Sequence, residues 1–214
     1  MLDTHMQLKD IFPKISKAIE ENDVARLDTL FKENTGSIDL LTPFGSWLHY
    51  AANKSSVATL KALVDFGIDL GIRVDPIDED VLSDKGMSAI VIAARAGDID
   101  NFKYFMQCNV ALDTHTSTAN PLFGAILGRS IEMARLLIAA GIDTTVRYSG
   151  ERMNNMDALA FALERGETEI ADVIALHQTN GDVKKAEELK AERHGKGRHG
   201  RPPVPENLKY KGES

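Results

Sequence analysis

The sequence predicts an all-α fold built from a repeated helical hairpin, and three observations support this prediction. Aromatic residues make up only 6% of the 214 residues, and alanine, leucine and isoleucine supply much of the apolar content, which suits closely packed helices. Apolar residues recur at spacings of three and four in several segments. Small residues and a later glycine recur at corresponding places in most of these segments, so we expect a stack of helix-turn-helix units.

Residues 120–143 contain the clearest copy of the unit. Ala134 and Leu137 fall on one face of its second helix, and Gly141 follows, where a left-handed helix end favours glycine. One alanine in the first helix locates the copies at steps of 33, 42, 32 and 37 residues, so the underlying period is near 33. These alanines are Ala18, Ala51, Ala93, Ala125 and Ala162.

The units are expected in order over about residues 14–178. The first unit is polar enough to cap the stack, and Asn34 stands at the end of its second helix in place of glycine. An insertion at 73–86 separates the second unit from the third, in which Asn109 replaces the glycine. The fifth unit follows an extended stretch at 144–154, and these two insertions explain the longer steps.

The unit resembles the ankyrin repeat, which reads roughly G-x-T-P-L-H-x-A-A-x-x-G-(H)-x-x-V-V-x-L-L-L-x-x-G-A-D. Four copies match in register, and the first copy is degenerate. The resemblance implies an all-α ankyrin-repeat solenoid of about five helix-turn-helix repeats, followed by a C-terminal helix and a basic tail. The matching residues of the second, third and fourth repeats are Ser46, Leu48, His49, Ala51, Ala52, Leu63, Gly67 and Asp69; Gly86, Ser88, Ile90, Ala93, Ala94 and Gly97; and Pro121, Leu122, Ala125, Leu136, Leu137, Gly141 and Asp143.

The chain is divided into three segments in this interpretation. Residues 1–178 form the ankyrin-repeat domain, residues 179–194 form a C-terminal capping helix, and residues 195–214 form a basic tail rich in glycine and proline. Asp182 is placed to cap the helix, and the apolar residues of that helix are expected to pack on the last repeat. These apolar residues are Val183, Ala186 and Leu189.

Charge and cysteine content limit the expected partners and compartment. Residues 1–180 have a net charge of −10 and residues 181–214 a net charge of +3, and an acidic body argues against wrapping duplex DNA. Nucleic acid is therefore an unlikely partner except through residues 193–211. A single cysteine, Cys108, favours a reducing compartment. The start lacks a secretory signal and no apolar run approaches about 20 residues, so we expect a cytoplasmic protein without a membrane span.

No pattern typical of catalysis, of a cofactor site or of a metal site stands out. Residues 195–200 match G-x-G-x-x-G, but that motif binds nucleotides between a strand and a helix, and prolines follow it here. The histidines lack metal-ligand spacing, and the acidic insertion lacks the D-x-D-x-D-G pattern of a calcium loop. Cys108 is interpreted as an unreactive surface residue. We expect a protein that is not an enzyme and uses no cofactor.

Trp47 and His49 stand at the start of the second repeat. The resemblance implies that the ring of His49 hydrogen-bonds to the backbone or to the hydroxyl of Ser46, which is a structural role. Trp47 replaces the proline usual at its position, and two interpretations stay open: it fills space between repeats, or it contacts a partner.

The resemblance implies binding through loop tips and through the exposed face of the first helices. Lys54, Arg95, Arg129 and Arg165 recur at nearly the same place in successive repeats, which predicts a basic stripe that meets carboxylates or phosphates; scattered solvated charges are the alternative. Arg129 also replaces the glycine that usually ends the first helix. The acidic insertion is either a solvated loop or a docking loop for a basic partner. The candidate partner-binding residues are Trp47, Lys54, Phe66, Asp78, Glu79, Asp80, Met87, Arg95, Arg129, Met153, Met156 and Arg165.

We predict a non-catalytic protein that binds a protein partner through this surface. The irregular repeats resemble those of bacterial or phage ankyrin proteins, which implies an immunity-like inhibitor of a basic toxin or another enzyme. One alternative is a structural or adaptor subunit that its tail anchors in a larger assembly. Another is a protein whose tail, with P-x-x-P at Pro202–Pro205, binds RNA or an anionic surface.

Overall fold

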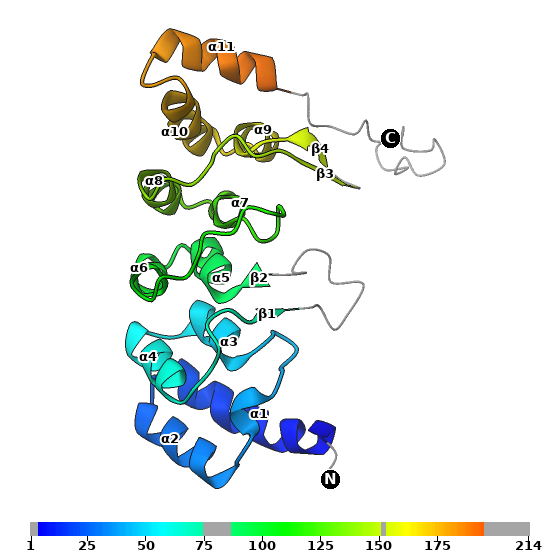
Figure 1. Cartoon of the computed structure of the whole chain (residues 1–214), viewed down its shortest axis with the longest axis vertical. Coiled ribbons are helices and arrows are strands. Elements are labelled where there is room, and N and C mark those ends of the chain that lie inside the picture. Colours follow the sequence, from blue (N-terminus) through cyan, green and yellow to red (C-terminus); the bar gives the residue numbers. More distant parts are fainter. Residues whose placement is uncertain (1–3, 75–86, 151–152, 195–214) are drawn as a thin grey trace, which may run out of the picture. The chain divides into compact units, whose positions relative to one another are not determined.

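A computed structural model describes residues 4–74, 87–150 and 153–194 of the chain (Figure 1). These residues form eleven α-helices, one short 3₁₀ turn and two two-stranded hairpins. The all-α prediction is confirmed, because each strand is only two to four residues long. The chain divides into two compact units, Met1–Asp143 and Thr144–Ser214, here named unit 1 and unit 2.

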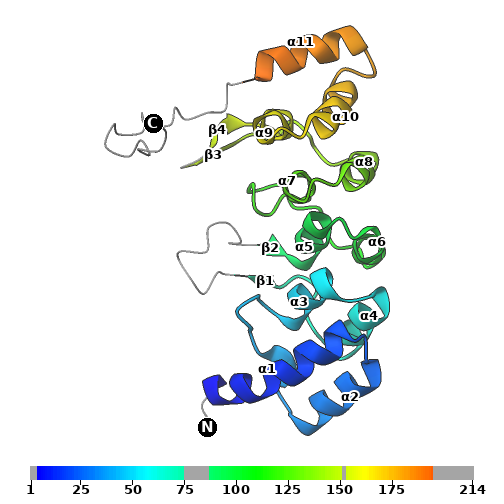
Figure 2. The same ribbon diagram turned by 180° about the vertical axis from the view of Figure 1, so that it is seen from behind.

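Unit 1 contains four stacked helical pairs. They are α1 Thr4–Glu20 with α2 Val24–Glu33, α3 Trp47–Lys54 with α4 Val57–Asp65, α5 Ala89–Ala96 with α6 Ile99–Gln107, and α7 Pro121–Leu127 with α8 Ile131–Ala139. The helices α3, α5 and α7 pack on one another in one column, and α4, α6 and α8 form a second column beside it (Figures 1 and 2). The turn η1, Ser37–Asp39, connects the first pair to the second.

The first column is held together by small residues. The recurring alanines of the first four repeats are fully buried, and small side chains allow helix axes to approach closely. The closest approach joins α5 to α7. A Cβ atom at Gly124 would lie 3.1 Å from the carbonyl oxygen of Val91, and one at Gly128 would lie 1.8 Å from that of Arg95. The two glycines therefore set the spacing between the third and fourth repeats.

Polar caps and left-handed residues mark the helix ends. The side chain of Asp98 accepts a hydrogen bond from the backbone N–H three residues on and begins α6. Asn109 adopts φ +57° after α6, as predicted for the residue that replaces glycine. The prediction for Asn34 is wrong, because its side-chain amide donates to the carbonyl of Leu30 and its φ is −122°. Gly36 makes the left-handed turn instead, at φ +86°.

The third repeat of unit 1 begins with a short antiparallel hairpin. Strand β1, Arg73–Val74, pairs with strand β2, Met87–Ser88. The hairpin brackets residues 75–86, so most of the predicted acidic insertion lies outside the described residues. This holds for the candidate residues Asp78, Glu79 and Asp80.

Unit 2 begins with a second hairpin and ends with three helices. Strand β3, Tyr148–Gly150, pairs with strand β4, Met153–Met156, immediately before α9, Ala158–Arg165. The second helix of this repeat is α10, Thr168–Gln178, and α11, Val183–Arg193, packs on both α9 and α10. This helix stands where the sequence predicts a cap on the last repeat.

The apolar contact of α11 is smaller than predicted. Asp182 caps the helix as expected, since its Oδ1 accepts a hydrogen bond from the backbone N–H of Lys185 at 3.1 Å. Of the three apolar residues expected to pack, Ala186 is buried and Leu189 is half-buried. The prediction for Val183 is wrong, because its side chain is 65% exposed at the start of the helix.

Ion pairs hold α11 where apolar contact is scarce. Nε of Arg193 donates to Oδ2 of the buried Asp157 at 2.9 Å, and Nη2 of Arg147 lies 3.4 Å from the same oxygen. Lys190 is paired with Asp172. The end of unit 2 is therefore closed mainly by polar contacts between α11 and α9 or α10.

Candidate partner-binding surface

His49 has a structural role, as the sequence predicts. Its Nδ1 accepts a hydrogen bond from the hydroxyl of Ser46 at 2.7 Å, and Nε2–H donates to the backbone carbonyl of Met87 at 3.2 Å. These two bonds fit the neutral ring, with its proton on Nε2. Burial lowers the pKa of His49 to about 4. The ring therefore joins the second repeat to the third and is not a surface site.

Trp47 fills space between repeats, which decides between the two interpretations left open by the sequence. Its side chain is fully buried, and its indole N–H donates to the carbonyl of Ser37 at 2.8 Å. The ring of Phe12 stacks on it at 5.6 Å between centroids. The expectation that Trp47 contacts a partner is therefore wrong, because α1 and η1 cover the position that proline usually occupies.

Two of the candidate methionines are also buried. Met87 lies in β2 and Met156 ends β4, and both side chains point into the protein rather than to solvent. The prediction of surface contact is wrong for both, because the residue that enters the first helix of a repeat helps to fill its core. Met153, at the other end of β4, is half-buried and keeps some surface.

The four basic candidates are all exposed. In unit 1, Lys54 ends α3, Arg95 lies in the last turn of α5 and Arg129 follows α7. Gly128 sits against the carbonyl of Arg95, which brings the backbone before Arg129 next to the end of α5. In unit 2, Arg165 ends α9, and its guanidinium lies 5.4 Å from the ring centre of Phe161. The first-helix ends of unit 1 thus carry a cation in each of three successive repeats.

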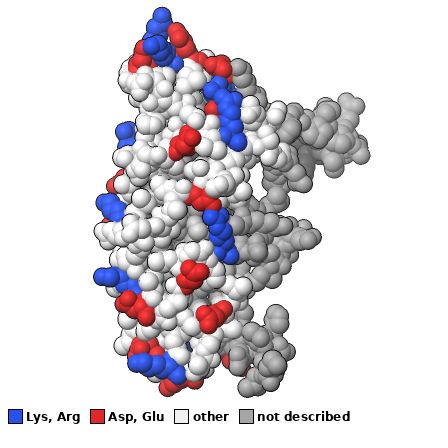
Figure 3. Space-filling model, viewed as in Figure 1, with Lys and Arg blue, Asp and Glu red and all other residues white. Residues whose placement is uncertain are grey.

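Neither sign of charge dominates the described surface in view. Lysines and arginines alternate with carboxylates and are separated by uncharged surface on the face that Figure 3 displays. This mixed distribution favours short-range contacts of single cations with a partner over a long-range electrostatic field of one sign. The joint action of the four basic residues stays a prediction.

Phe66 keeps part of its surface at the end of α4. Its ring meets Phe31 edge to face, with 5.5 Å between the centroids, so it is half-buried against the first repeat. The basic tail, including the glycine motif at 195–200 and most of the predicted nucleic-acid segment 193–211, lies outside the described residues.

Sequence reasoning missed two exposed apolar residues before the second repeat. Leu41 is 53% exposed and Phe44 is 60% exposed. Leu41 directly precedes the turn Thr-Pro-Phe-Gly at 42–45, and Phe44 is the third residue of that turn. The available signal was an apolar residue placed inside a turn motif, where polar residues are usual.

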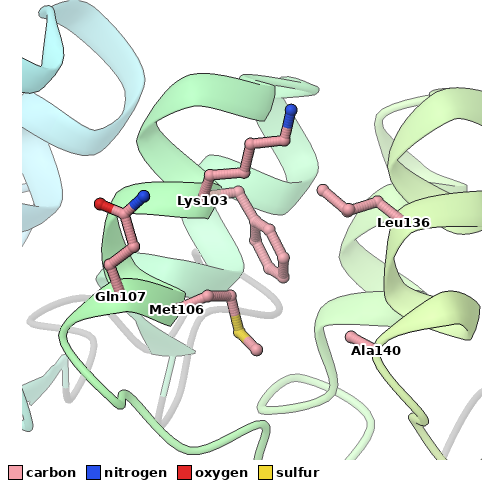
Figure 4. A pocket seen from close by; sticks show the side chains of 6 residues that line it. Lys103, Met106, Gln107, Leu136 and Ala140 are labelled. Atoms are coloured by element: carbon pink, nitrogen blue, oxygen red, sulfur yellow. The ribbon is translucent and has the colours of Figure 1, made fainter.

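The second helix column carries a shallow hollow of about 370 Å³ between α6 and α8 (Figure 4). Met106 faces Leu136 and Ala140 across it, while Phe102, Lys103 and Gln107 complete its lining. The lining is mainly hydrocarbon and lacks converging polar groups, so the hollow supports apolar contact rather than chemistry.

Metal ligation and membrane insertion have no support in the part of the chain that the structure describes. Over residues 4–74, 87–150 and 153–194, no three His, Cys, Asp or Glu side chains gather where they could hold a metal ion. Within the same ranges, no helix combines the length and apolar character needed to span a bilayer.

Comparisons with known proteins agree with the helical repeats. Residues 48–148 match the family model of ankyrin repeats in three copies. The crystal structure of the human ASB11 ankyrin repeat domain is similar, with a TM-score of 0.60 and 14% sequence identity over 84% of this chain and 82% of that chain. At this level of identity the likeness concerns the fold alone. No curated protein matches the sequence.

Proposed function

We propose that this chain, which is an ankyrin-repeat protein, is a non-catalytic module that binds a protein partner through the ends of its first helices and the adjacent loops. Ankyrin repeats generally mediate contacts between proteins. One observation carries the assignment of the surface: Lys54, Arg95 and Arg129 stand exposed at corresponding ends of three stacked helices. The apolar faces of the same helices are used within the core, so these ends are the part of each repeat left for recognition.

The chemistry of this surface favours a partner that presents carboxylates. Arginine side chains offer paired N–H donors that match a carboxylate in geometry as well as in charge. Arg165 repeats the same feature in unit 2, where it lies over an aromatic ring. In unit 1 the stripe therefore selects acidic side chains at intervals set by the repeats.

The overall charge supports a finer form of the proposal, in which the partner is a basic toxin or enzyme that this chain inhibits. Residues 1–180 carry a net charge of −10, and a charge of this sign speeds the approach of a cationic protein. In this form the acidic residues guide the encounter, and the basic stripe pairs with carboxylates at the contact. The cytoplasm is the compartment that the single cysteine favours.

Charge reversal on the first helices tests the proposal. The double variant Arg95→Glu/Arg129→Glu places two carboxylates against carboxylates of the partner, and we expect about a tenfold or greater loss of affinity. The partner is first identified by affinity purification from the native cell with mass spectrometry. Its binding to the purified variant is then measured by calorimetry.

A matched control changes the same net charge elsewhere in unit 1. Lys61 on α4 and Arg135 on α8 are exposed on the second column, so Lys61→Glu/Arg135→Glu should retain the affinity of the unaltered chain. If both double variants lost the same affinity for the partner, the loss would be due to net charge and not to the position of the stripe. Unchanged binding by the first variant would contradict it outright.

A further inference from the structure

Large apolar side chains are concentrated on one loop of unit 1. Among the described residues only three large apolar side chains are exposed, and two of them, Leu41 and Phe44, lie three positions apart in the sequence. The third is Val183 on α11 of unit 2. Exposed apolar groups that cluster mark interaction sites far more often than scattered ones do.

The loop that carries them is rigidly hydrogen-bonded. Thr42 and Gly45 exchange two backbone hydrogen bonds, of 2.8 and 3.0 Å. The buried hydroxyl of Thr42 also donates to the carbonyl of Gly45 at 2.7 Å and accepts from the N–H of Phe44 at 3.0 Å. Phe44 is thus held in place before any partner arrives, which lowers the entropy cost of binding.

Neighbouring rings extend this surface into an aromatic patch, defined by Leu41, Phe44, Phe12 and Tyr50. The ring of Phe12 on α1 stacks on that of Phe44 at 6.3 Å, and Tyr50 on α3 lies 5.8 Å from Phe12 and 5.7 Å from Phe44. The helices α1 and α3 pack on each other, so the patch joins two elements distant in sequence (Figure 2).

A carboxylate stands at the edge of the aromatic patch. The hydroxyl of Tyr50 donates to Oε1 of Glu20 at 2.5 Å. Burial and this contact raise the pKa of Tyr50 to about 12, so the phenol keeps its proton. The patch therefore combines flat aromatic surface with one negative group.

We propose that the aromatic patch binds the proline-rich segment 201–205 of a second copy of this chain. Prolines with fixed φ form extended segments that dock on aromatic surfaces at low entropy cost. The segment reads Arg-Pro-Pro-Val-Pro, so a cation directly precedes the first proline. Pro202 and Pro205 lie on the rings of Phe44 and Tyr50, and Arg201 pairs with Glu20. The prolines and the adjacent cation of the segment are chemically complementary to the rings and the carboxylate of the patch.

Within one molecule the chain between α11 and the segment limits where the segment can lie, whereas a second copy has no such limit. Arg201 follows the end of α11 at Arg193 by eight residues, which span at most about 28 Å. The patch lies on the first two helical pairs of unit 1, and two further pairs follow before unit 2 begins at Thr144.

Mixing two deficient variants of the full chain tests the proposal. Phe44→Ser removes the patch and keeps the segment, whereas Pro202→Ala/Pro205→Ala keeps the patch and removes the segment. Sedimentation velocity between about 10 µM and 1 mM covers the affinities of short peptide motifs. We expect the unaltered chain to self-associate, each variant alone to lose at least about tenfold in affinity, and the mixture to recover a 1:1 pair.

Val183→Ser is the matched control, because Val183 is as exposed as Phe44 but lies on α11; it should leave self-association unchanged. Circular dichroism checks that all variants fold. Failure of the mixture to pair overturns the proposal, as does the absence of self-association in the unaltered chain. If Phe44→Ser weakened self-association and the proline variant did not, another segment would occupy the patch. That result would also overturn the proposal.

Discussion

At the scale of single residues, His49 holds two repeats together through a ring that must stay neutral. Its Nδ1 accepts from Ser46, and Nε2–H donates to the carbonyl of Met87. Protonation would place a second proton where the Ser46 hydroxyl now donates, and would put a charge in a buried position. The link between the second and third repeats is therefore sensitive to acid.

We expect a fall in stability below neutral pH that depends on His49. The pKa of His49 is 6.5 in the unfolded chain and about 4 when folded, because burial disfavours the charged ring. The contribution of the neutral ring to the free energy of unfolding is complete above pH 6.5 and is lost progressively as the pH falls toward 4. The loss amounts to about 2 kcal/mol at pH 5. Urea unfolding at pH 7 and pH 5 measures the difference.

The variant His49→Gln is the comparison for this measurement. Glutamine retains a donor and an acceptor but does not titrate, so its stability should change less between the two pH values than that of the unaltered chain. The same change in both proteins would contradict the assignment of the acid sensitivity to His49.

At the scale of elements, the contact between α5 and α7 is the tightest in unit 1 for a definite reason. Gly124 and Gly128 stand one helical turn apart on α7 or at its end, and both face the backbone of α5. At Gly128 the nearest atoms all belong to the backbone of Arg95, so no flexible group there could move aside. A side chain added at Gly128 must therefore push the two helices apart.

We expect Gly128→Ala to destabilise the protein by about 3 kcal/mol or more, because its Cβ would overlap the carbonyl oxygen of Arg95. The φ of Gly128 is −79°, which alanine adopts without strain, so the overlap is the cause being measured. Gly124→Ala is the control: its contact of 3.1 Å is milder, and alanine's helix propensity offsets up to about 1 kcal/mol. Equal effects in thermal unfolding would disprove this explanation.

At the scale of the whole molecule, stability is distributed unevenly along the chain. The described part of α11 buries one side chain, Ala186, whereas α9 and α10 each bury four. Arg193 compensates partly, because it reaches the buried carboxylate of Asp157. A helix held in this way opens more readily than its neighbours do.

Hydrogen exchange should reveal this difference within unit 2. We expect the amides of α11 to exchange faster than those of α9, and Arg193→Gln to speed α11 by about tenfold, since it breaks a partly buried ion pair. Lys184→Gln removes an exposed pair with Glu188 and should have little effect. Similar exchange in both variants would mean that the pair with Asp157 does not hold the helix.

The repeat period predicted more than the local environment of single residues. It located the buried alanines, the role of His49 and the left-handed Asn109, because these follow from position within a repeat. It left open whether Trp47 is buried, since that depends on Phe12 in the degenerate first repeat. The exposure of Val183 likewise depends on which face α11 presents, and several faces are nearly equally polar.

The candidate surface was predictable only in part, for the same reason. A position at the end of a first helix guarantees exposure, so Lys54, Arg95, Arg129 and Arg165 were identified from spacing alone. Met87 and Met156 each stand two residues before the first residue of a helix, where a small rotation decides between core and solvent. Phe44 departs from the repeat pattern, so no comparison between repeats could predict its exposure.

Arg129 carries an exposed charge on a residue with a left-handed backbone conformation. It adopts φ +59°, while the residues at the matching helix ends of the third and fifth repeats are Gly97 and Gly166, at +71° and +77°. An arginine in this conformation is less stable than glycine by about 1 kcal/mol. At this one position the sequence keeps a charged side chain at a cost in backbone stability, which agrees with the proposed role of Arg129 in binding a partner.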